Sequence, residues 1–449
     1  MFRSIINFWD NTSFYLNTKV YYAGYIIAAI FVLSFFVPPL QTIALFLLLG
    51  IVILIFADTV LLYHKRGIGS ERIVPARMSN GDENKIVLVI RNAYSFKISC
   101  TIIDELPYQF QERAWKKTLE IEGQSTTEFE YYVKPKERGE YHFGHINIYT
   151  AGPLQMVKRR AILGEEQIVK VYPSYIQMRR YQLMAVANTL NQSGMKRMRK
   201  IGHSIEFEQI KEYVAGDDFR TINWKATARK GDMMVNNFTD ERSQQIYCLV
   251  NKGRVMKMPF NGMTLLDYAI NASLVLSSVA LQKQDKAGLI AFAQNIDAFL
   301  PADKKPTQIN HLLETLYKQQ TAFLEPDMEK LFSVVRNRIT QRSLLVLFTN
   351  FESFDSLERV LPYLKRLAHY HLLMVVFFDN TELKTLIETK SSTVEDIYIK
   401  TIAEKYRHEK GLIVKELQKD GIIAVLSTPQ NLTINALNKY LELKTRQSI

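Results

Sequence analysis

The chain has 449 residues, a formal net charge of +12 and 47% hydrophobic residues. This length is expected to form two or three folding units rather than one domain. Only two cysteines occur, Cys100 and Cys248, each inside an apolar run. This excludes a disulfide framework and a cysteine-based metal site, and it fits buried thiols in a reducing compartment.

Almost no charge occurs between Val20 and Leu62, and Pro38-Pro39 divides this stretch in two. Proline breaks a helix because it lacks an amide donor and clashes with the preceding turn. Each half is long enough to cross a bilayer core of ~30 Å, which needs roughly 20 apolar residues. A signal peptide would show one short apolar run with a cleavage site, and a buried core hairpin is the other alternative. The sequence predicts a membrane anchor over residues 1–66, with transmembrane helices at about 20–37 and 40–62.

Positive charges flank both predicted spans on the same side, and the turn between the spans carries none. The flanking residues are Arg3, Lys19, Lys65, Arg66, Arg72 and Arg77. The positive-inside bias then places both termini and the soluble domains in the cytoplasm, with the anchor in the inner membrane. Anionic lipid is an expected partner of these charges. Asp58, near the inner end of the second span, is expected to reach the headgroups.

Residues 72–173 predict a β-sandwich-like domain, since short β-branched or aromatic runs alternate with turn residues. The expected strands are 85–90, 97–103, 127–133, 141–149 and 168–172. No catalytic constellation occurs in this region, so a spacer or interaction role is expected.

Residues 174–244 are expected to hold a linker, around 174–203, followed by a motif-rich segment. The linker contains a basic cluster, formed by Lys196, Arg197, Arg199 and Lys200. This cluster is interpreted as a nucleic-acid or lipid patch, or as a solvated loop. Nucleic-acid binding is not expected, because no interleaved aromatics or recognisable module accompany the cluster.

From residue 245 to 449, strand-like runs alternate with helical ones. Strands are expected at 246–250, 287–293, 297–300, 344–348, 372–378 and 422–426, and helices at 265–282, 308–319, 328–339, 357–370, 394–419 and from 434 onward. Near-continuous apolar strands are typical of a parallel sheet covered on both faces. The alternation predicts an α/β, Rossmann-like layer architecture.

The common catalytic motifs are missing from the sequence: a glycine-rich phosphate loop, a dinucleotide fingerprint, H-E-x-x-H and G-x-S-x-G. His369 and His371 flank a helix-to-strand junction, and further zinc ligands cannot be placed beside them. An enzyme is therefore not expected.

The C-terminal pattern resembles the von Willebrand factor A domain, whose adhesion site binds Mg²⁺ through D-x-S-x-S after the first strand and an Asp after a later strand. The equivalent positions here are Asn251, Gly253, Val255 and Asn350. They supply no carboxylate and no hydroxyl, which Mg²⁺ requires. A degenerate site without metal or other cofactor is predicted, although Glu352 and Asp355 could lend a carboxylate.

The segment 206–238 carries the most specific pattern of the chain, EFEQIKEYVAGDDFRTINWKATARKGDMMVNNF. It resembles the signature of the bacterial domain of unknown function 58 family, E-Y-x-x-G-D-D-x-R-x-I-N-W-x-A-x-A-R. The R-G-x-Y-x-F-G element at 138–144 and V-Y-P at 171–173 extend the resemblance. It implies a membrane-anchored protein with a von Willebrand factor A-like domain that works with a MoxR-type AAA+ ATPase. The signature residues are Glu206, Glu212, Tyr213, Gly216, Asp217, Asp218, Arg220, Asn223, Trp224 and Arg229.

Two interpretations of the signature stay open, a folding clamp and a docking surface for the ATPase. As a clamp, Arg220 and Arg229 would fork onto Asp217, Asp218 or Glu212, and Trp224 would bury its ring against the sheet. The sequence thus predicts a non-enzymatic scaffold or adaptor that binds a protein partner. A metal-dependent binding or hydrolytic domain with non-standard ligands is the alternative.

Overall fold

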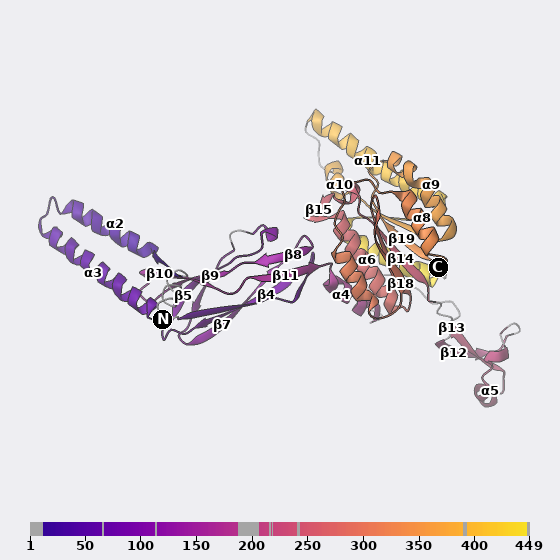
Figure 1. Ribbon diagram of the computed structural model, residues 1–449, viewed down its shortest axis with the longest axis horizontal. Helices are drawn as coiled ribbons and strands as arrows, with labels where there is room; N and C mark the ends of the chain where they lie inside the picture. Colours follow the sequence, from indigo (N-terminus) through magenta and orange to yellow (C-terminus); the bar gives the residue numbers. More distant parts are fainter. Residues whose placement is uncertain are drawn as a thin grey trace. The chain divides into compact units, whose positions relative to one another are not determined.

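The computed structural model describes residues 12–64, 67–112, 115–186, 206–214, 217, 219–239, 243–388 and 393–446. The chain separates into two compact units, Met1–Val171 and Tyr172–Ile449 (Figure 1). The fold is a mixed α/β structure with several sheets, as the sequence predicts.

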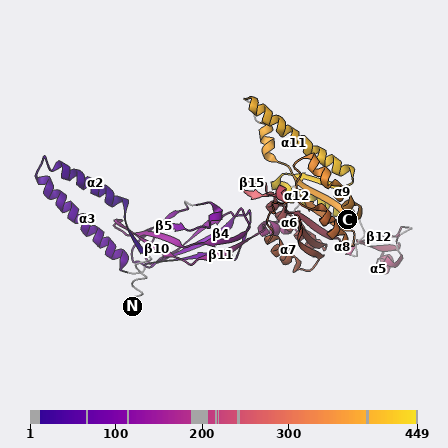
Figure 2. The ribbon, with the colours of Figure 1, turned by 45° about the horizontal axis from the view of Figure 1, so that its top comes forward.

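The first unit begins with strand β1 (Thr12–Leu16) and two apolar helices, α2 (Thr18–Leu33) and α3 (Pro39–Tyr63). The two helices lie side by side as a hairpin in Figures 1 and 2. Helix α3 has 25 residues and a mean hydropathy of 2.8, so it is long and apolar enough to cross a membrane. Helix α2 has 16 residues and is shorter than the predicted span. The turn between them exposes Phe35 and Phe36, at 86% and 76%.

Asp58, which was expected to reach the headgroups, is completely buried where α3 meets the β-domain. Its Oδ2 accepts hydrogen bonds from the backbone amides of Met156 and Val157, at 2.8 and 2.9 Å. A Cβ at Gly152 would lie 2.6 Å from Asp58 Oδ1, so only glycine permits this approach. Tertiary contacts therefore override the expected exposure of this carboxylate.

The start of α2 and the end of α3 each form hydrogen bonds with the β-domain. Asn17 caps α2 and donates from Nδ2 to the Gln155 carbonyl at 2.8 Å. The Leu62 carbonyl near the end of α3 accepts from Tyr94 Oη and Arg159 Nη1, both at 2.6 Å. The helical hairpin and the β-domain are consequently one hydrogen-bonded unit.

Three sheets build the β-domain. Their orders are β1-β10-β9-β5-β6, β3-β11-β8 and β2-β4-β7. The strands are β2 (Ile68–Ile73), β3 (Arg77–Ser79), β4 (Asn84–Asn92), β5 (Ile98–Asp104), β6 (Lys117–Ile121), β7 (Ser125–Val133), β8 (Gly139–Phe143), β9 (Ile146–Ala151), β10 (Val157–Leu163) and β11 (Gln167–Tyr172), with a short 3-10 turn η1 (Tyr108–Phe110). All pairings recorded in these sheets are antiparallel among the residues described.

A buried ion pair lies inside this domain. Arg72 donates to both carboxylate oxygens of Asp104, and Tyr131 Oη also donates to Asp104. Burial raises the pKa of Asp104, and the Arg72 guanidinium opposes that rise. Arg72 is thus held in the domain interior, although the sequence analysis counted it among the basic residues expected to flank the membrane spans.

The second unit is built on a six-stranded sheet, ordered β18-β17-β14-β19-β20-β21. The strands are β14 (Gln245–Asn251), β17 (Lys286–Phe292), β18 (Ile296–Asp303), β19 (Leu344–Phe348), β20 (Leu372–Phe378) and β21 (Ile423–Ser427). Edge strand β18 is antiparallel to β17, and the other neighbours pair in parallel. In chain order this is 3-2-1-4-5-6, an order that reverses between β14 and β19.

Helices cover both faces of this sheet (Figure 1). One core cluster joins the sheet to α6 (Leu265–Gln282), α7 (Gln308–Tyr317) and α12 (Leu432–Thr445), and the other joins it to α8 (Met328–Arg338), α9 (Phe354–Tyr370) and α11 (Val394–Lys419). Although α6 is also long and apolar, 83% of its apolar window is buried, so it is a core helix. Figure 2 shows that the N-terminal part of α11 extends beyond the sheet, next to α10 (Thr381–Glu388).

Several predicted elements differ from the structure. The expected linker begins with helix α4 (Tyr175–Val186), whose Tyr175, Met178 and Tyr181 pack against the core beside α6. The single strand expected at 141–149 is two strands, β8 and β9, because Gly144 and His145 turn the chain between them. Helix α10 was not predicted. Both cysteines are buried free thiols, as expected.

Candidate functional site

The sheet edge between β14 and β19 is the first candidate site, because parallel sheets bind ligands where the strand order reverses. Asn251 ends β14 and is fully buried. Its Oδ1 accepts from the Gly253 amide at 2.8 Å, and its Nδ2 donates to Thr349 Oγ1 at 2.9 Å. Both ends of the amide are therefore used to close the edge rather than to hold a ligand.

Packing also occupies the next two predicted positions. A Cβ at Gly253 would lie 2.9 Å from Pro326 Cδ and 3.1 Å from the Leu324 carbonyl oxygen. Val255 packs against the hydrophobic core in the short turn η4 (Arg254–Met256). Packing contacts of the fold therefore account for both positions.

Lys410 of α11 places an ammonium group at the same edge. Its Nζ donates to Asn350 Oδ1 at 2.9 Å and to the Phe351 carbonyl, and it lies 5.6 Å from the centre of the Phe377 ring. Burial lowers the pKa of Lys410 to about 8, and the carboxylates of Asp379 and Glu352 act in the opposite direction. The Lys410 ammonium thus lies where the sequence suggested that a metal ion would bind in a von Willebrand factor A-like site.

These residues do not fit Mg²⁺. The edge offers two amide groups that are already bonded and an ammonium that repels a second cation, and the nearby carboxylates of Glu352 and Asp379 face that ammonium's charge. Within the part of the chain that the structure describes, no group of three or more His, Cys, Asp or Glu could hold a metal ion. Asp355 lies in the first turn of α9, which Ser353 and Ser356 cap reciprocally, so an ordinary helix-start role explains it.

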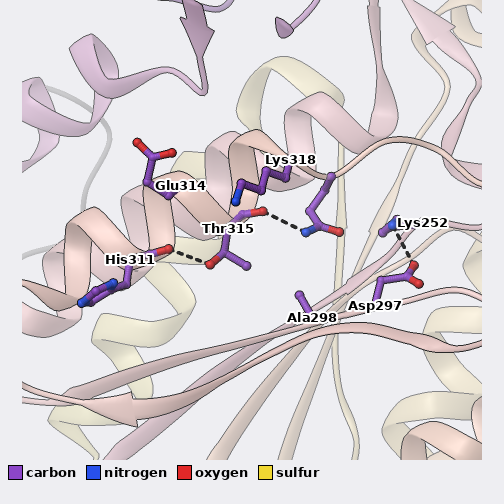
Figure 3. A pocket seen from close by; sticks show the side chains of 8 residues that line it. Lys252, Asp297, Ala298, His311, Glu314, Thr315 and Lys318 are labelled. Atoms are coloured by element: carbon purple, nitrogen blue, oxygen red, sulfur yellow. Dashed lines mark hydrogen bonds and ion pairs between the residues drawn. The ribbon is translucent and has the colours of Figure 1, made fainter.

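A polar hollow of about 470 Å³ adjoins this edge between β18 and α7 (Figure 3). Lys252 follows Asn251 and forms an ion pair with Asp297 at 2.7 Å on the strand side of the hollow. On α7, Thr315 Oγ1 donates to the His311 carbonyl of its own helix at 2.7 Å. This hydroxyl is therefore committed to the helix backbone.

The signature segment forms a separate small substructure, which we call the signature module (the described residues of 206–239). Strands β12 (Glu206–Glu212) and β13 (Met234–Thr239) pair as an antiparallel hairpin. Between them lie the 3-10 turn η3 (Phe219–Thr221) and helix α5 (Trp224–Lys230). Gly216 and Asp218 lie outside the described residues, as does the basic cluster 196–200.

Asn223 and Thr227 attach α5 to β13. The Asn223 side chain caps α5 by accepting from the Ala226 amide at 3.0 Å, and its Nδ2 donates to Asn236 Oδ1 at 2.8 Å. Thr227 Oγ1 accepts from the Met234 amide at 3.0 Å. Gly231 ends the helix with φ of +85°, a left-handed conformation that glycine adopts without strain.

The structure describes two of the three predicted clamp carboxylates, Asp217 and Glu212. Asp217 pairs with Lys211 at 2.8 Å, and Glu212 pairs with Lys230 at 2.6 Å. The hydrogen bond from Lys230 lowers the pKa of Glu212. Among the described residues Arg229 forms no ion pair with either carboxylate, while Arg220 lies 5.9 Å from the centre of the Phe219 ring.

Trp224 is also not buried against the sheet, since 71% of it is exposed. The side chains of Asn223 and Thr227 form the hydrogen bonds that hold α5 to β13, and Trp224 takes no part in them. Phe219 is 70% exposed. Further exposed apolar residues of the signature module are Ile210, Val214 and Met233. Tyr213 takes part through its backbone amide, which donates to the Met233 carbonyl at 2.7 Å.

Sequence reasoning missed Lys410 and the pair of Lys252 and Asp297. Lys410 lies 60 positions after Asn350, inside a helix rich in other charged residues. Nothing in the local pattern distinguishes it from solvent-exposed lysines of the same helix.

Comparison with known proteins supports the family resemblance. Residues 209–399 match the model of a family described as "Protein of unknown function DUF58". This range includes the signature from Glu212 to Arg229. The resemblance noted in the sequence is therefore confirmed over that part of the chain.

A curated relative is similar at low identity: the "Uncharacterized protein YeaD" of Bacillus subtilis (strain 168) is 22% identical over 269 residues, 58% of this chain and 65% of the relative. The chain thus spans less than two thirds of that relative's length. Among solved structures, the conserved hypothetical protein BatB from Bacteroides thetaiotaomicron is 12% identical, with a TM-score of 0.30, over 45% of this chain and all of that chain. The CARDB domain of the PF1109 protein from Pyrococcus furiosus is 12% identical, with a TM-score of 0.17, over 23% of this chain and 86% of that chain.

Proposed function

We propose that this protein is a membrane-anchored, non-enzymatic scaffold that binds a protein partner through its signature module. The partner that the family resemblance implies is a MoxR-type AAA+ ATPase. The exposed aromatic pair of Phe219 and Trp224 on the signature module is the observation that carries the proposal.

The hairpin of α2 and α3 supports membrane anchoring. Its apolar side chains are exposed along both helices, and a contiguous apolar surface of this size requires a covering phase. Helix α3 is ~37 Å long at 1.5 Å per residue, which exceeds the bilayer core of ~30 Å. Flanking basic residues favour the inner membrane, with the soluble domains in the cytoplasm.

The sheet order and the position of Asn251 support a von Willebrand factor A-like second unit that works without a metal. Lys410 provides a fixed cation at the sheet edge, and the two amides of Asn251 and Asn350 are bonded internally. The unit thus keeps the strand order of a ligand-binding sheet. Hydrogen bonds within the chain occupy the position of the usual ion site. This arrangement also weighs against metal-dependent binding or hydrolysis.

The apolar side chains of the signature module support docking, because they are exposed and do not pack into a core of the chain. Tryptophan and arginine dominate the binding energy of protein interfaces. An indole exposed to water does not stabilise the folded domain. A partner that covers the indole removes its apolar area from water, and this burial favours binding.

The test is purification of the tagged full-length chain from native membranes at its natural level, in parallel with the variant Trp224→Ala. The proposal predicts that a MoxR-type ATPase accompanies the wild-type chain and is lost with the variant. Recovery of the ATPase with both chains would contradict docking through the signature module. Its absence from both would contradict the partner.

A further inference from the structure

Helix α5 presents a face that combines an indole with positive charge. Trp224, Lys225, Ala228 and Arg229 are all exposed, and their spacing of one, four and five residues places them on one side of the helix. The opposite side carries Thr227, which is bonded to β13. We call these four exposed residues the α5 face.

No described residue neutralises the two cations of the α5 face. Among the described residues, neither Lys225 nor Arg229 has a hydrogen bond or an ion pair. By contrast, Lys211 and Lys230 of the same module are paired with Asp217 and Glu212. Two lysines of the module are thus paired with its own carboxylates, whereas Lys225 and Arg229, on the same helix face as the exposed indole, have no such partner among the described residues.

We propose that the α5 face binds an acidic protein segment, whose carboxylates pair with Lys225 and Arg229 and whose apolar side chain covers Trp224. The inference deepens the proposed function and rests on it, because it specifies the chemistry of the partner at the same surface. Arginine pairs with carboxylates through two parallel hydrogen bonds, and the indole supplies apolar area and selectivity. Complementary charge also accelerates encounter with the partner.

A nucleic acid fits the α5 face less well than an acidic protein does. Helix α5 is only ~10 Å long, and its two free cations span less than the groove that tracks a phosphate backbone. A nucleic-acid surface would need a longer run of unpaired cations. Lys211 and Lys230 cannot extend the run, since both are already paired.

The experiment measures binding of a fluorescent acidic copolymer of glutamate and tyrosine to the full-length chain in non-ionic detergent. The expected result is saturable binding that weakens with salt and falls about tenfold or more in Trp224→Ala and in the double variant Lys225→Glu/Arg229→Glu. The neutral double variant Lys225→Gln/Arg229→Gln should fall between the wild type and the charge reversal.

The matched control is Lys134→Glu/Lys136→Glu, which makes the same charge change at two exposed lysines of the first unit. Equal losses in both charge-reversed proteins would overturn the proposal, because binding would then follow net charge alone. Unchanged binding by Trp224→Ala would also overturn it, as would no binding at all or tighter binding of a single-stranded oligonucleotide of equal charge. Circular dichroism of each variant checks that the fold is retained.

This experiment does not involve the ATPase, so failure of the inference and failure of the proposed function are distinguishable. Copolymer binding through the α5 face without any ATPase binding would contradict the partner and support the acidic chemistry. ATPase binding that is equal in wild type and Lys225→Glu/Arg229→Glu would contradict the acidic chemistry and leave the scaffold role intact.

Discussion

Replacing Lys410 with methionine tests whether this lysine is the buried cation of the sheet edge. Methionine has a similar length and shape but no charge, so the variant removes the ammonium and its bonds to Asn350 and Phe351. At neutral pH two effects oppose each other. The variant no longer buries a charge, but it leaves two oxygen acceptors unsatisfied at a cost of about 1–3 kcal/mol each.

The pH dependence separates these two effects. The ordinary pKa of lysine is 10.5, and burial lowers the pKa of Lys410 to about 8. Below pH 8 the native and unfolded states both carry the charge, and the native state bears the cost of burying it. Between about pH 8 and 10.5 the unfolded state binds the proton and the native state does not, so stability rises with pH. At about 1.4 kcal/mol per pKa unit, the wild type should gain about 3 kcal/mol relative to Lys410→Met over this range.

The assay is calorimetric unfolding of the full-length chain in detergent at a series of pH values from 7 to 10.5. A relative gain of about 3 kcal/mol corresponds to a rise of roughly 6 °C or more in the midpoint difference. Lys405→Met is the matched control, because Lys405 lies on the same helix with a largely exposed side chain. Curves that stay parallel for wild type and Lys410→Met, or that diverge equally for Lys405→Met, would refute a buried ammonium at this edge.

Three further outcomes are expected. Asp58→Ala should cost the first unit about 2–4 kcal/mol of unfolding free energy, because two buried amides lose their acceptor; Asp58→Asn should cost less, and equal thermal midpoints for both would contradict the contact. Gly253→Ala should destabilise the second unit by about 1–3 kcal/mol through overpacking against Pro326, whereas Gly411→Ala, in an open helical position, should leave it unchanged or stabilised. Titration calorimetry with Mg²⁺ or Mn²⁺ should give no saturable heat; a saturable heat would show that the closed edge opens to metal.

The sequence predicts the second unit well because its physical signal is strong and local. The apolar run at 344–348 becomes β19 with the same bounds, and 394–419 becomes α11. Continuous apolar strands are needed in a sheet covered on both faces, so their pattern survives in a single sequence. Helix α4 was missed because its residues were assigned to the linker, although most of them are apolar or aromatic.

The site could be predicted only in part, since its chemistry depends on distant contacts. The absence of oxygen ligands at Asn251, Gly253 and Val255 is visible in the sequence, but the cation from Lys410 is not. Trp224 was expected to be buried because a large apolar side chain usually is. Its exposure depends on which side of α5 lies against β13. The cap at Asn223 and the hydrogen bond at Thr227 fix that side.

The most direct test of the account is the affinity of the purified full-length chain for a purified MoxR-type ATPase of the same organism, measured with Mg²⁺ and after its removal by chelation. To keep the nucleotide state of the ATPase constant, both arms are run without nucleotide. The account predicts saturable binding that is the same in both arms and is lost in Trp224→Ala. Binding that requires the metal, or that persists unchanged in Trp224→Ala, would contradict a metal-independent scaffold that docks through the signature module.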